Sequence, residues 1–259
     1  MIEDIKPEMP RREFIEQLSL KTALILSVCS ISGLAEKALA QDESAYVPED
    51  HNYAMGVDIH KCIGCGRCAA ACKQENKVPP EPEFFRTWVE RYVIPTEGDA
   101  HVDSPNGGID GFPELQQSEE GILRAFFVPK LCNHCDNPPC VQVCPVGATF
   151  RSRDGVVLVD EEWCVGCRYC IQACPYGARY LHPEEKVADK CTFCYHRIRR
   201  GLLPACVEAC PTSARIFGEI GDKASPLRRF MRFNDVTVLK PGLNTEPKVY
   251  YAGADGEVR

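Results

Sequence analysis

Cysteine is the residue whose number and spacing could do chemistry in this chain. Sixteen of the seventeen cysteines fall into four runs of four. The first and third runs share the spacing C-x2-C-x2-C-x3-C, and they are Cys62, Cys65, Cys68 and Cys72, and Cys164, Cys167, Cys170 and Cys174. The second and fourth are stretched variants with the same x3-C end, and they are Cys132, Cys135, Cys140 and Cys144, and Cys191, Cys194, Cys206 and Cys210. The unstretched spacing is the ligand run of bacterial ferredoxins, which indicates iron–sulfur chemistry.

The spacing fits the geometry of a cubane cluster. A short loop wraps three corners of a cube with its thiolates but cannot reach the fourth, so the last ligand comes from elsewhere. In ferredoxins the fourth cysteine of one run binds the cluster of another, so runs work in pairs and four runs predict four clusters. Gly64, Gly66 and Gly166 lie between ligands. There they let backbone N–H groups turn toward the cluster sulfurs.

Three other uses of the cysteines compete with this interpretation. Structural zinc sites are built from two separated C-x2-C pairs, which leaves the third cysteine and the x3-C end of each run without a role. A disulfide framework is typical of chains too small to form a core, whereas this chain has 259 residues. Unused thiols at this density would be a hazard in an oxidising compartment. The spacing therefore favours clusters.

The composition bounds the class of protein. The formal net charge is −7, from 30 basic and 37 acidic residues, which argues against nucleic acid as the main partner. Four clusters would occupy volume that apolar side chains fill in an ordinary domain, so we expect stability to depend on the metal. The sequence carries no nucleophile motif, phosphate loop or nicotinamide fingerprint. We therefore expect a non-catalytic subunit rather than an enzyme in its own right.

The N-terminus has the features of an export signal. The pair Arg11 and Arg12 precedes the apolar stretch 18–34, and Ala38-Leu39-Ala40 forms a cleavage site. These features predict a twin-arginine signal peptide over 1–40, and the alternative is an ordinary amphipathic helix. The twin-arginine route exports folded proteins, so clusters could be assembled before export. Its apolar part, 22–34, is interrupted by serines and glycine and is too short for a membrane span, so we expect none in the mature chain. Cys29 lies in this segment and receives no role.

The rest of the chain divides around the cysteine runs. We predict a part with the first run and an insertion over 41–130, a module over 131–186, the fourth run over 187–221 and a tail over 222–259. Within the insertion of 78–121, a strand or hairpin arm is expected at 86–94. The remaining strands are expected at 53–58, 123–128 and 155–159, helices at 69–76 and 224–233, and extended chain at 236–251.

The residues between the ligands carry a family resemblance. The second run reads C-N-H-C-D-N-P-P-C-V-Q-V-C-P, the third reads C-V-G-C-R-Y-C-I-Q-A-C-P, and the fourth begins C-T-F-C and ends C-V-E-A-C-P. In this order they resemble the iron–sulfur electron-transfer (beta) subunit of the dimethyl sulfoxide reductase superfamily complexes. The match covers about 56–218, and 240–251 also looks like the C-terminal segment of this family. The exported type is similar to the subunits of tetrathionate, polysulfide and nitrite reductases and of the sulfite-reduction-associated membrane complex.

The resemblance implies an α+β fold with two bacterial ferredoxin-like [4Fe-4S] modules in one chain, separated by inserted loops. Runs one and four would share one module, and runs two and three the other. Because every ligand position is a cysteine, it implies four [4Fe-4S] clusters that form a wire. The ligand sets that it implies are site 1 (Cys62, Cys65, Cys68 and Cys210), site 2 (Cys191, Cys194, Cys206 and Cys72), site 3 (Cys132, Cys135, Cys140 and Cys174) and site 4 (Cys164, Cys167, Cys170 and Cys144).

The function implied by the resemblance is single-electron transfer within a respiratory complex. The partners would be a polytopic quinone-interacting membrane subunit and a periplasmic redox or catalytic subunit. The chain would then lie in the periplasm or at the outer face of the cytoplasmic membrane. One alternative is a free-standing soluble periplasmic polyferredoxin shuttle. Another is a catalytic subunit with an open cluster, which sixteen ligand cysteines do not favour.

The sequence leaves two interpretations open for the role of several residues outside the ligand set. His134 and Arg168 lie inside ligand loops and either tune cluster potentials or are solvated. The basic segment 197–200 is either a docking patch or a solvated face. The aromatic side chains are expected to pack around the modules, and they are Trp88, Trp163, Phe84, Phe85, Phe126 and Phe127.

Overall fold

The computed structural model describes residues 46–114 and 121–258, and the part from Val47 onward is one compact unit. The expected signal peptide and Cys29 lie outside the described residues. None of the helices described is long and apolar enough to cross a membrane. The N-terminal end of the described chain forms the short helix η2 (Pro48–Asp50), which leads directly into the first strand.

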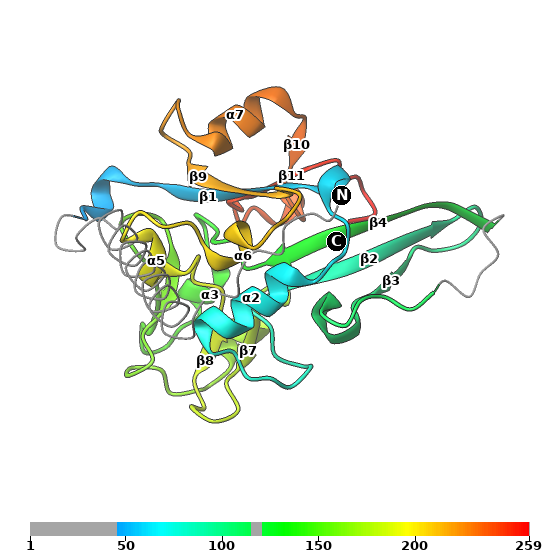
Figure 1. Ribbon diagram of the computed structural model, residues 1–259. Helices are drawn as coiled ribbons and strands as arrows, with labels where there is room; N and C mark the ends of the chain where they lie inside the picture. Colours follow the sequence, from blue (N-terminus) through cyan, green and yellow to red (C-terminus); the bar gives the residue numbers. More distant parts are fainter. Residues whose placement is uncertain (1–45, 115–120, 259) are drawn as a thin grey trace, which may run out of the picture. The chain divides into compact units, whose positions relative to one another are not determined.

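A four-stranded sheet forms the main core (Figure 1). Its order is β10 (Val236–Thr237), β11 (Val249–Ala252), β1 (Tyr53–Asp58) and β9 (Arg215–Glu219). The central strand β1 is buried along its whole length, and it pairs antiparallel with β9 and parallel with β11. Helix α7 (Pro226–Phe233) packs on this sheet through Leu227 and Phe230. The sheet thus joins the start of the described chain to its end.

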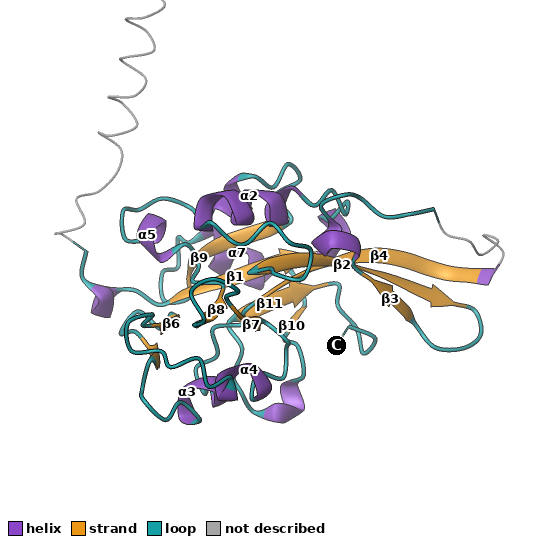
Figure 2. Ribbon diagram, turned by 90° about the horizontal axis from the view of Figure 1, so that it is seen from below, coloured by secondary structure: helices purple, strands orange, loops and turns teal. Residues whose placement is uncertain are grey.

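The insertion and the strand that follows it form a second, three-stranded sheet. Its order is β3 (His101–Asp103), β2 (Thr87–Pro95) and β4 (Ile122–Leu131), and all pairings are antiparallel. Figures 1 and 2 show β2 and β4 running out together as a long arm. The short helix η4 (Pro105–Gly108) follows β3. Because β4 ends at Leu131, the arm leads directly into the second cysteine run at Cys132.

The cysteine runs lie in loops between very short elements. The first run is bounded by η3 (Ile59–Lys61) and contains the start of α2 (Arg67–Asn76). The elements around the second and third runs are α3 (Pro139–Gln142), β5 (Thr149–Arg151), β6 (Val157–Val159), α4 (Tyr169–Gln172), β7 (Arg179–Leu181) and β8 (Ala188–Lys190). The fourth run spans α5 (Tyr195–Ile198) and α6 (Ala205–Glu208), and η6 (Pro241–Leu243) lies in the tail.

Helix contacts show how the runs pair. Helix α2 of the first run packs against α6 of the fourth, and α3 of the second packs against α4 of the third. Strands β5 and β6 form one antiparallel hairpin beside the second run, and β7 and β8 form another after the third. This is the expected arrangement of two ferredoxin-like modules, with one built from the two ends of the described chain.

Some expectations differ from the structure. The strand at 53–58 has the predicted bounds, but the helix at 69–76 begins two residues earlier, at Arg67. Only the two ends of the segment 236–251 are strands. Trp163 is 67% exposed, so the expectation that it packs around a module was wrong. Its backbone N–H bonds to Asp160 at 3.3 Å, and this turn directs the indole outward.

Candidate iron–sulfur sites

The thiols of site 1 surround one cavity. Cys62 and Cys65 come from the loop before α2, Cys68 lies in the first turn of α2, and Cys210 follows α6, so the fourth thiol arrives from the other end of the module. The cavity has an empty volume of about 310 Å³, and Arg215 also lines it. The loop turns through left-handed backbone at Gly64 and Gly66, with φ of 68° and 66°. These glycines allow three thiols to face one volume.

Site 3 has the same construction. Its four cysteines line a cavity with an empty volume of about 320 Å³, and they are Cys132, Cys135, Cys140 and Cys174. Cys132 and Cys135 come from the loop after β4, Cys140 lies in α3, and Cys174 belongs to the third run. Arg179 also lines this cavity, and its Nη2 donates to Cys140 Sγ at 3.1 Å. Both cavities therefore combine four thiols with one buried guanidinium.

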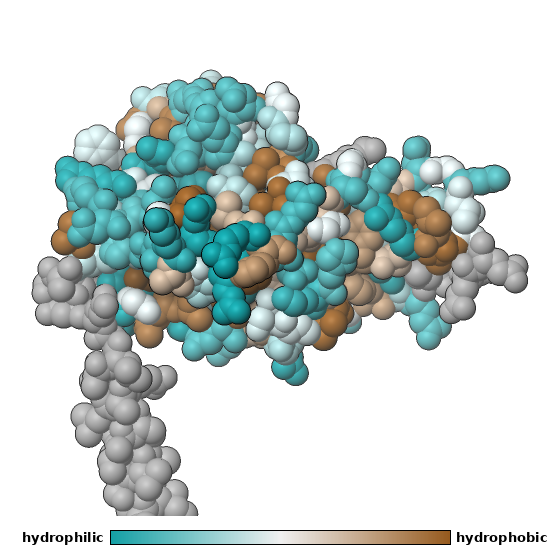
Figure 3. Space-filling view, turned by 90° about the horizontal axis from the view of Figure 1, so that it is seen from above, coloured by the Kyte–Doolittle hydropathy of each residue, from teal (hydrophilic) through white to brown (hydrophobic). Residues whose placement is uncertain are grey.

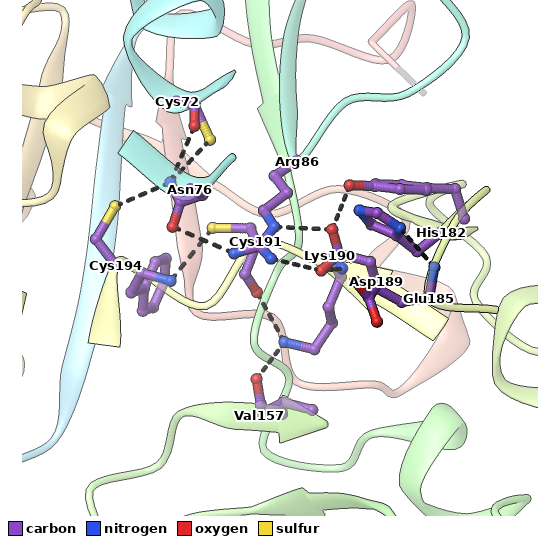
Figure 4. Close-up of polar contacts among 12 residues, drawn as sticks. Cys72, Asn76, Arg86, Val157, His182, Glu185, Asp189, Lys190, Cys191 and Cys194 are labelled. Atoms are coloured by element: carbon purple, nitrogen blue, oxygen red, sulfur yellow. Dashed lines mark hydrogen bonds and ion pairs between the residues drawn. The ribbon is translucent and has the colours of Figure 1, made fainter. Parts of the chain in front are cut away.

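Site 2 lies inside the protein. The Cys72 thiol interacts electrostatically with those of Cys191, Cys206 and Cys194. Asn76 joins the two runs, because its Nδ2 lies 3.5 Å from both Cys72 Sγ and Cys194 Sγ (Figure 4). An amide that donates to two ligand sulfurs stabilises their negative charge. The sequence reasoning missed Asn76, although its position four residues after Cys72 on a helix places it on the same face.

The Asn76 amide is held in place by a short chain of polar side chains. Arg86 Nη1 donates to Asn76 Oδ1 at 3.2 Å, which fixes which end of the amide faces the sulfurs. The same guanidinium forms two bonds to the carboxylate of Asp189, at 3.0 and 2.9 Å. Figure 4 shows this chain running from Cys72 to Asp189. It ties the first run to strand β8, which immediately precedes Cys191.

The proposed ligands of site 4 lie next to site 3. Cys164 and Cys170 pack with Cys140 of site 3 in one cluster of side chains. The backbone N–H of Ala188 bonds to Cys164 Sγ, and that of Thr149 to Cys144 Sγ, each at 3.4 Å. Cys167 is exposed. The convergence of all four thiols on one cluster stays a prediction here.

Burial raises the pKa of several of these thiols in the absence of metal. It raises the pKa of Cys62 to about 11 and those of Cys135 and Cys206 to about 12. Burial also acts against the thiolate at Cys144, but backbone N–H groups, that of Thr149 first, lower its pKa overall. A metal that binds such thiols must displace their protons and supply the positive charge.

The donor sets of sites 1 and 3 fit polynuclear clusters. Among residues 46–114 and 121–258, no three His, Cys, Asp or Glu side chains converge closely enough to hold one metal ion. The quartets of sites 1 and 3 each line one cavity. Four thiols around such a cavity, with backbone N–H groups aimed at sulfur, match the donor set of a cubane cluster.

Neighbouring sites follow one another through the chain. Cys206 of site 2 interacts electrostatically with Cys68 of site 1, and Cys191 of site 2 interacts with Cys132 of site 3. Cys140 of site 3 packs in the same cluster of side chains as Cys170 of site 4. The order is therefore 1, 2, 3 and 4, so the two modules meet through sites 2 and 3.

The structure places His134 and Arg168 in different environments. His134 is fully buried, so it is not a solvated side chain. Its Nδ1 accepts a bond from the Val157 N–H at 3.1 Å, and burial lowers its pKa well below the usual range. The imidazole is therefore neutral and lies beside site 3. Arg168, in contrast, is exposed at the N-terminus of α4.

Two basic segments differ in their environment. In the segment 197–200, Arg197 forms ion pairs with Glu75 and Glu208 within the chain, and only Arg200 is exposed. The arginines of α7, in contrast, are exposed at Arg228, Arg229 and Arg232. Figure 3 shows that the face seen from above, which carries α7, is largely hydrophilic. The predicted basic helix is therefore present in the tail.

Two family models match the chain. Both are described as a 4Fe-4S dicluster domain, and they match residues 61–148 and 123–220. Together they span all four cysteine runs. The match to dicluster domains confirms the expectation of four [4Fe-4S] clusters in this chain.

Whole-chain comparisons find relatives of similar length. A tetrathionate reductase subunit of Salmonella typhimurium is 41% identical over 259 residues, which cover 97% of this chain and 91% of the relative. The protein of the same name from Archaeoglobus fulgidus is 47% identical, over 79% of this chain and 83% of its own. The protein NrfC of Escherichia coli K12 is 38% identical over 93% of both chains. The chain therefore belongs to the family of iron–sulfur subunits of tetrathionate and dimethyl sulfoxide reductase complexes that includes NrfC, and it is an electron-transfer subunit with four [4Fe-4S] clusters.

Proposed function

We propose that this subunit relays single electrons between a quinone-reactive membrane subunit and a periplasmic redox subunit of a respiratory complex. Sites 1 to 4 would hold the clusters through the sixteen cysteines assigned above. Each cluster supplies one-electron chemistry, whereas quinols and most respiratory acceptors exchange two electrons. A series of clusters therefore lets a two-electron donor pass its electrons one at a time to a distant two-electron acceptor.

The observation that carries this proposal is the unbroken order of the sites. Cys68 lies near Cys206, Cys191 lies near Cys132, and Cys140 packs with Cys170, so each site has the next as its neighbour. The outer sites have the more accessible thiols, because Cys65 in site 1 and Cys167 in site 4 are exposed. A route with buried inner sites and exposed ends suits transfer between two partners. Relatives named as tetrathionate reductase subunits make tetrathionate the first acceptor to assay.

The test uses the tagged full-length chain, purified anaerobically from membranes with whatever binds it. We expect a membrane subunit and a second redox subunit to copurify, and a quinol to reduce the clusters, as followed by the loss of visible absorbance. Cys191→Ser, in the middle of the route, is expected to block electron transfer to the acceptor subunit. Thr192→Ser in the same loop is the matched control. Recovery of the chain alone from the soluble periplasmic fraction would favour the free shuttle instead.

The proposed location has its own test. Replacing Arg11 and Arg12 by lysine is expected to leave the chain in the cytoplasm with its iron bound. Cys29→Ala, in the same segment, is the control and is expected to be exported normally. Export of the double-lysine variant would contradict the twin-arginine route without affecting the proposed electron transfer.

A further inference from the structure

Six cationic side chains are buried in the described part of the chain, and they divide into two groups. Arg91, Lys130 and Lys248 each form an ion pair with a carboxylate, with Asp103, Glu90 and Asp136 respectively. Arg179, Lys190 and Arg215 are 5%, 1% and 2% exposed, and no carboxylate of the described residues lies within ion-pair distance of them. A buried cation without a counter-charge is strongly unfavourable. A guanidinium keeps its proton, so some other negative charge must stabilise the two arginines. Burial lowers the pKa of Lys190, so this side chain needs the same negative charge nearby to act as a cation.

Arg215 lies between sites 1 and 2. Its side chain lines the site 1 cavity, where it interacts electrostatically with the thiols of Cys68 and Cys62. On its other side, Nη1 lies 3.8 Å from Sγ of Cys206, which belongs to site 2. Nη2 donates to Thr87 Oγ1 at 2.7 Å, and Nε is buried without a hydrogen-bond acceptor. The guanidinium is thus held firmly, with its charge shared between two sets of ligands.

Arg179 has the equivalent position between sites 3 and 4. Its Nη2 donates to Sγ of Cys140 in site 3 at 3.1 Å, and Nη1 approaches Thr149 Oγ1 at 3.4 Å. It also interacts electrostatically with Cys132 of site 3 and Cys170 of site 4. The sequence repeats this placement, because Cys174-Pro-Tyr-Gly-Ala-Arg179 and Cys210-Pro-Thr-Ser-Ala-Arg215 have the same spacing. Each arginine begins the strand that follows its run, β7 or β9.

Lys190 lies between sites 2 and 3, where the two modules meet. Its Nζ donates to the carbonyl of Val157 and, at 2.7 Å, to the carbonyl of Cys191, which is a ligand of site 2 (Figure 4). It interacts electrostatically with Cys132 and Cys140 of site 3 as well as with Cys191. Every step of the route from site 1 to site 4 therefore has one buried cation beside it.

We propose that Arg215, Lys190 and Arg179 set the reduction potentials along the route, each acting on the two clusters that flank it. A cluster gains one negative charge on reduction, and a nearby cation in a low-dielectric interior stabilises that charge. The cation thus raises the potentials of both neighbours, and sites 2 and 3, which each flank two cations, are raised more than sites 1 and 4. This inference rests on the proposed function, because it takes the ligand assignment of sites 1 to 4 as given.

The test is an EPR-monitored redox titration of the complex purified anaerobically, with signals assigned to sites through single Cys→Ser variants. Arg215→Met is expected to lower the midpoint potentials of sites 1 and 2, Lys190→Met those of sites 2 and 3, and Arg179→Met those of sites 3 and 4. The two remaining sites should not shift in each case. Arg91→Met is the matched control, because this buried arginine is paired with Asp103 of the insertion.

Charge-conserving variants separate the field of the cation from packing. Arg215→Lys, Lys190→Arg and Arg179→Lys are expected to keep potentials close to those of the unmodified protein. They should also restore full iron content wherever a methionine variant binds less iron. Unchanged potentials in fully loaded methionine variants, a uniform shift of all four sites, or equal shifts in the methionine and charge-conserving variants would overturn the proposal. Failure of the proposed function is distinguishable, since it would appear as missing iron or missing partners in the unmodified protein.

Discussion

The rings of His134 and Phe193 stack on each other with centroids 3.7 Å apart and planes inclined by 23°. His134 lies between Cys132 and Cys135, and Phe193 lies between Cys191 and Cys194, so the stack joins a ligand loop of each module. Both side chains are buried, at 0% and 1% exposure. The junction between sites 2 and 3 is therefore a packed aromatic contact rather than a water-filled gap.

Truncating this stack is expected to weaken the contact between the modules. Phe193→Leu removes the ring contact and leaves a partial cavity, which we expect to cost about 1–3 kcal/mol. Thermal unfolding of the iron-loaded chain, followed by visible absorbance, should show a lower midpoint temperature. Phe233→Leu is the control, because Phe233 is 66% exposed and the same substitution there should leave the transition unchanged. Equal midpoints for the two variants would contradict a stabilising role of the stack.

The first cysteine loop should not tolerate a side chain at Gly66. Its φ is 66°, and a Cβ there would lie 2.1 Å from the carbonyl oxygen of Gly108 in the insertion. Gly66→Ala is therefore expected to lower stability by about 2–4 kcal/mol and to loosen site 1. Gly147→Ala has a similar φ of 70° with no atom within 4 Å, so it should cost only about 1 kcal/mol. Iron content and thermal midpoints of the two variants test the difference.

Asn76 is expected to raise the potential of site 2. Its amide N–H groups face two ligand sulfurs, and such bonds favour the reduced, more negative cluster. Asn76→Leu should therefore lower the potential of site 2 in a redox titration and leave site 4 unchanged. Asn234→Leu is the control, because the Asn234 amide bonds to the carbonyl of Phe230 in the tail. A potential of site 2 that is the same in both variants would show that the amide has no effect.

Removal of the iron should unfold the modules. Without clusters, burial raises the pKa of the Cys191 thiol well above its usual range, and Arg179, Lys190 and Arg215 have no carboxylate partner in the described chain. We expect the apo chain to lose its cooperative thermal transition and to become sensitive to protease within 131–214. The main sheet around β1 should be cleaved last, because its core includes apolar contacts from α7. A sharp transition of the apo chain at the original temperature would contradict this.

The sequence predicted the parts of the structure that depend on ligand spacing. Cys62 and Cys210 are far apart in sequence, yet the spacing of ferredoxin runs and the family resemblance placed them in one site, and the structure brings them to one cavity. The strand at 53–58 was predicted with its bounds, since an apolar segment directly precedes the first run. These features depend on the spacing and the residue types within one segment or run, and not on which other segments pack against it.

Features that depend on long-range packing were missed. Strands β7 and β8 have three residues each, which is too short for a pattern of alternation. The parallel partner of β1 is β11, near the end of the chain, and nothing in either segment specifies the other. The sequence around Lys190 gives no sign that this lysine is buried, because its burial between two sites depends on how the modules meet. Trp163 reads as a core residue, but its turn directs it into solvent.

The central claim is tested most directly by measuring iron and acid-labile sulfide per chain on anaerobically purified protein. Low-temperature EPR spectra of the same protein are recorded before and after reduction with dithionite. Four [4Fe-4S] clusters predict about sixteen iron and about sixteen sulfide per chain, with interacting signals from reduced clusters. Zinc in place of iron with no EPR signal would contradict the account. A strong [3Fe-4S] signal in the oxidised protein that survives strict anaerobiosis would contradict the assignment of four complete cysteine quartets.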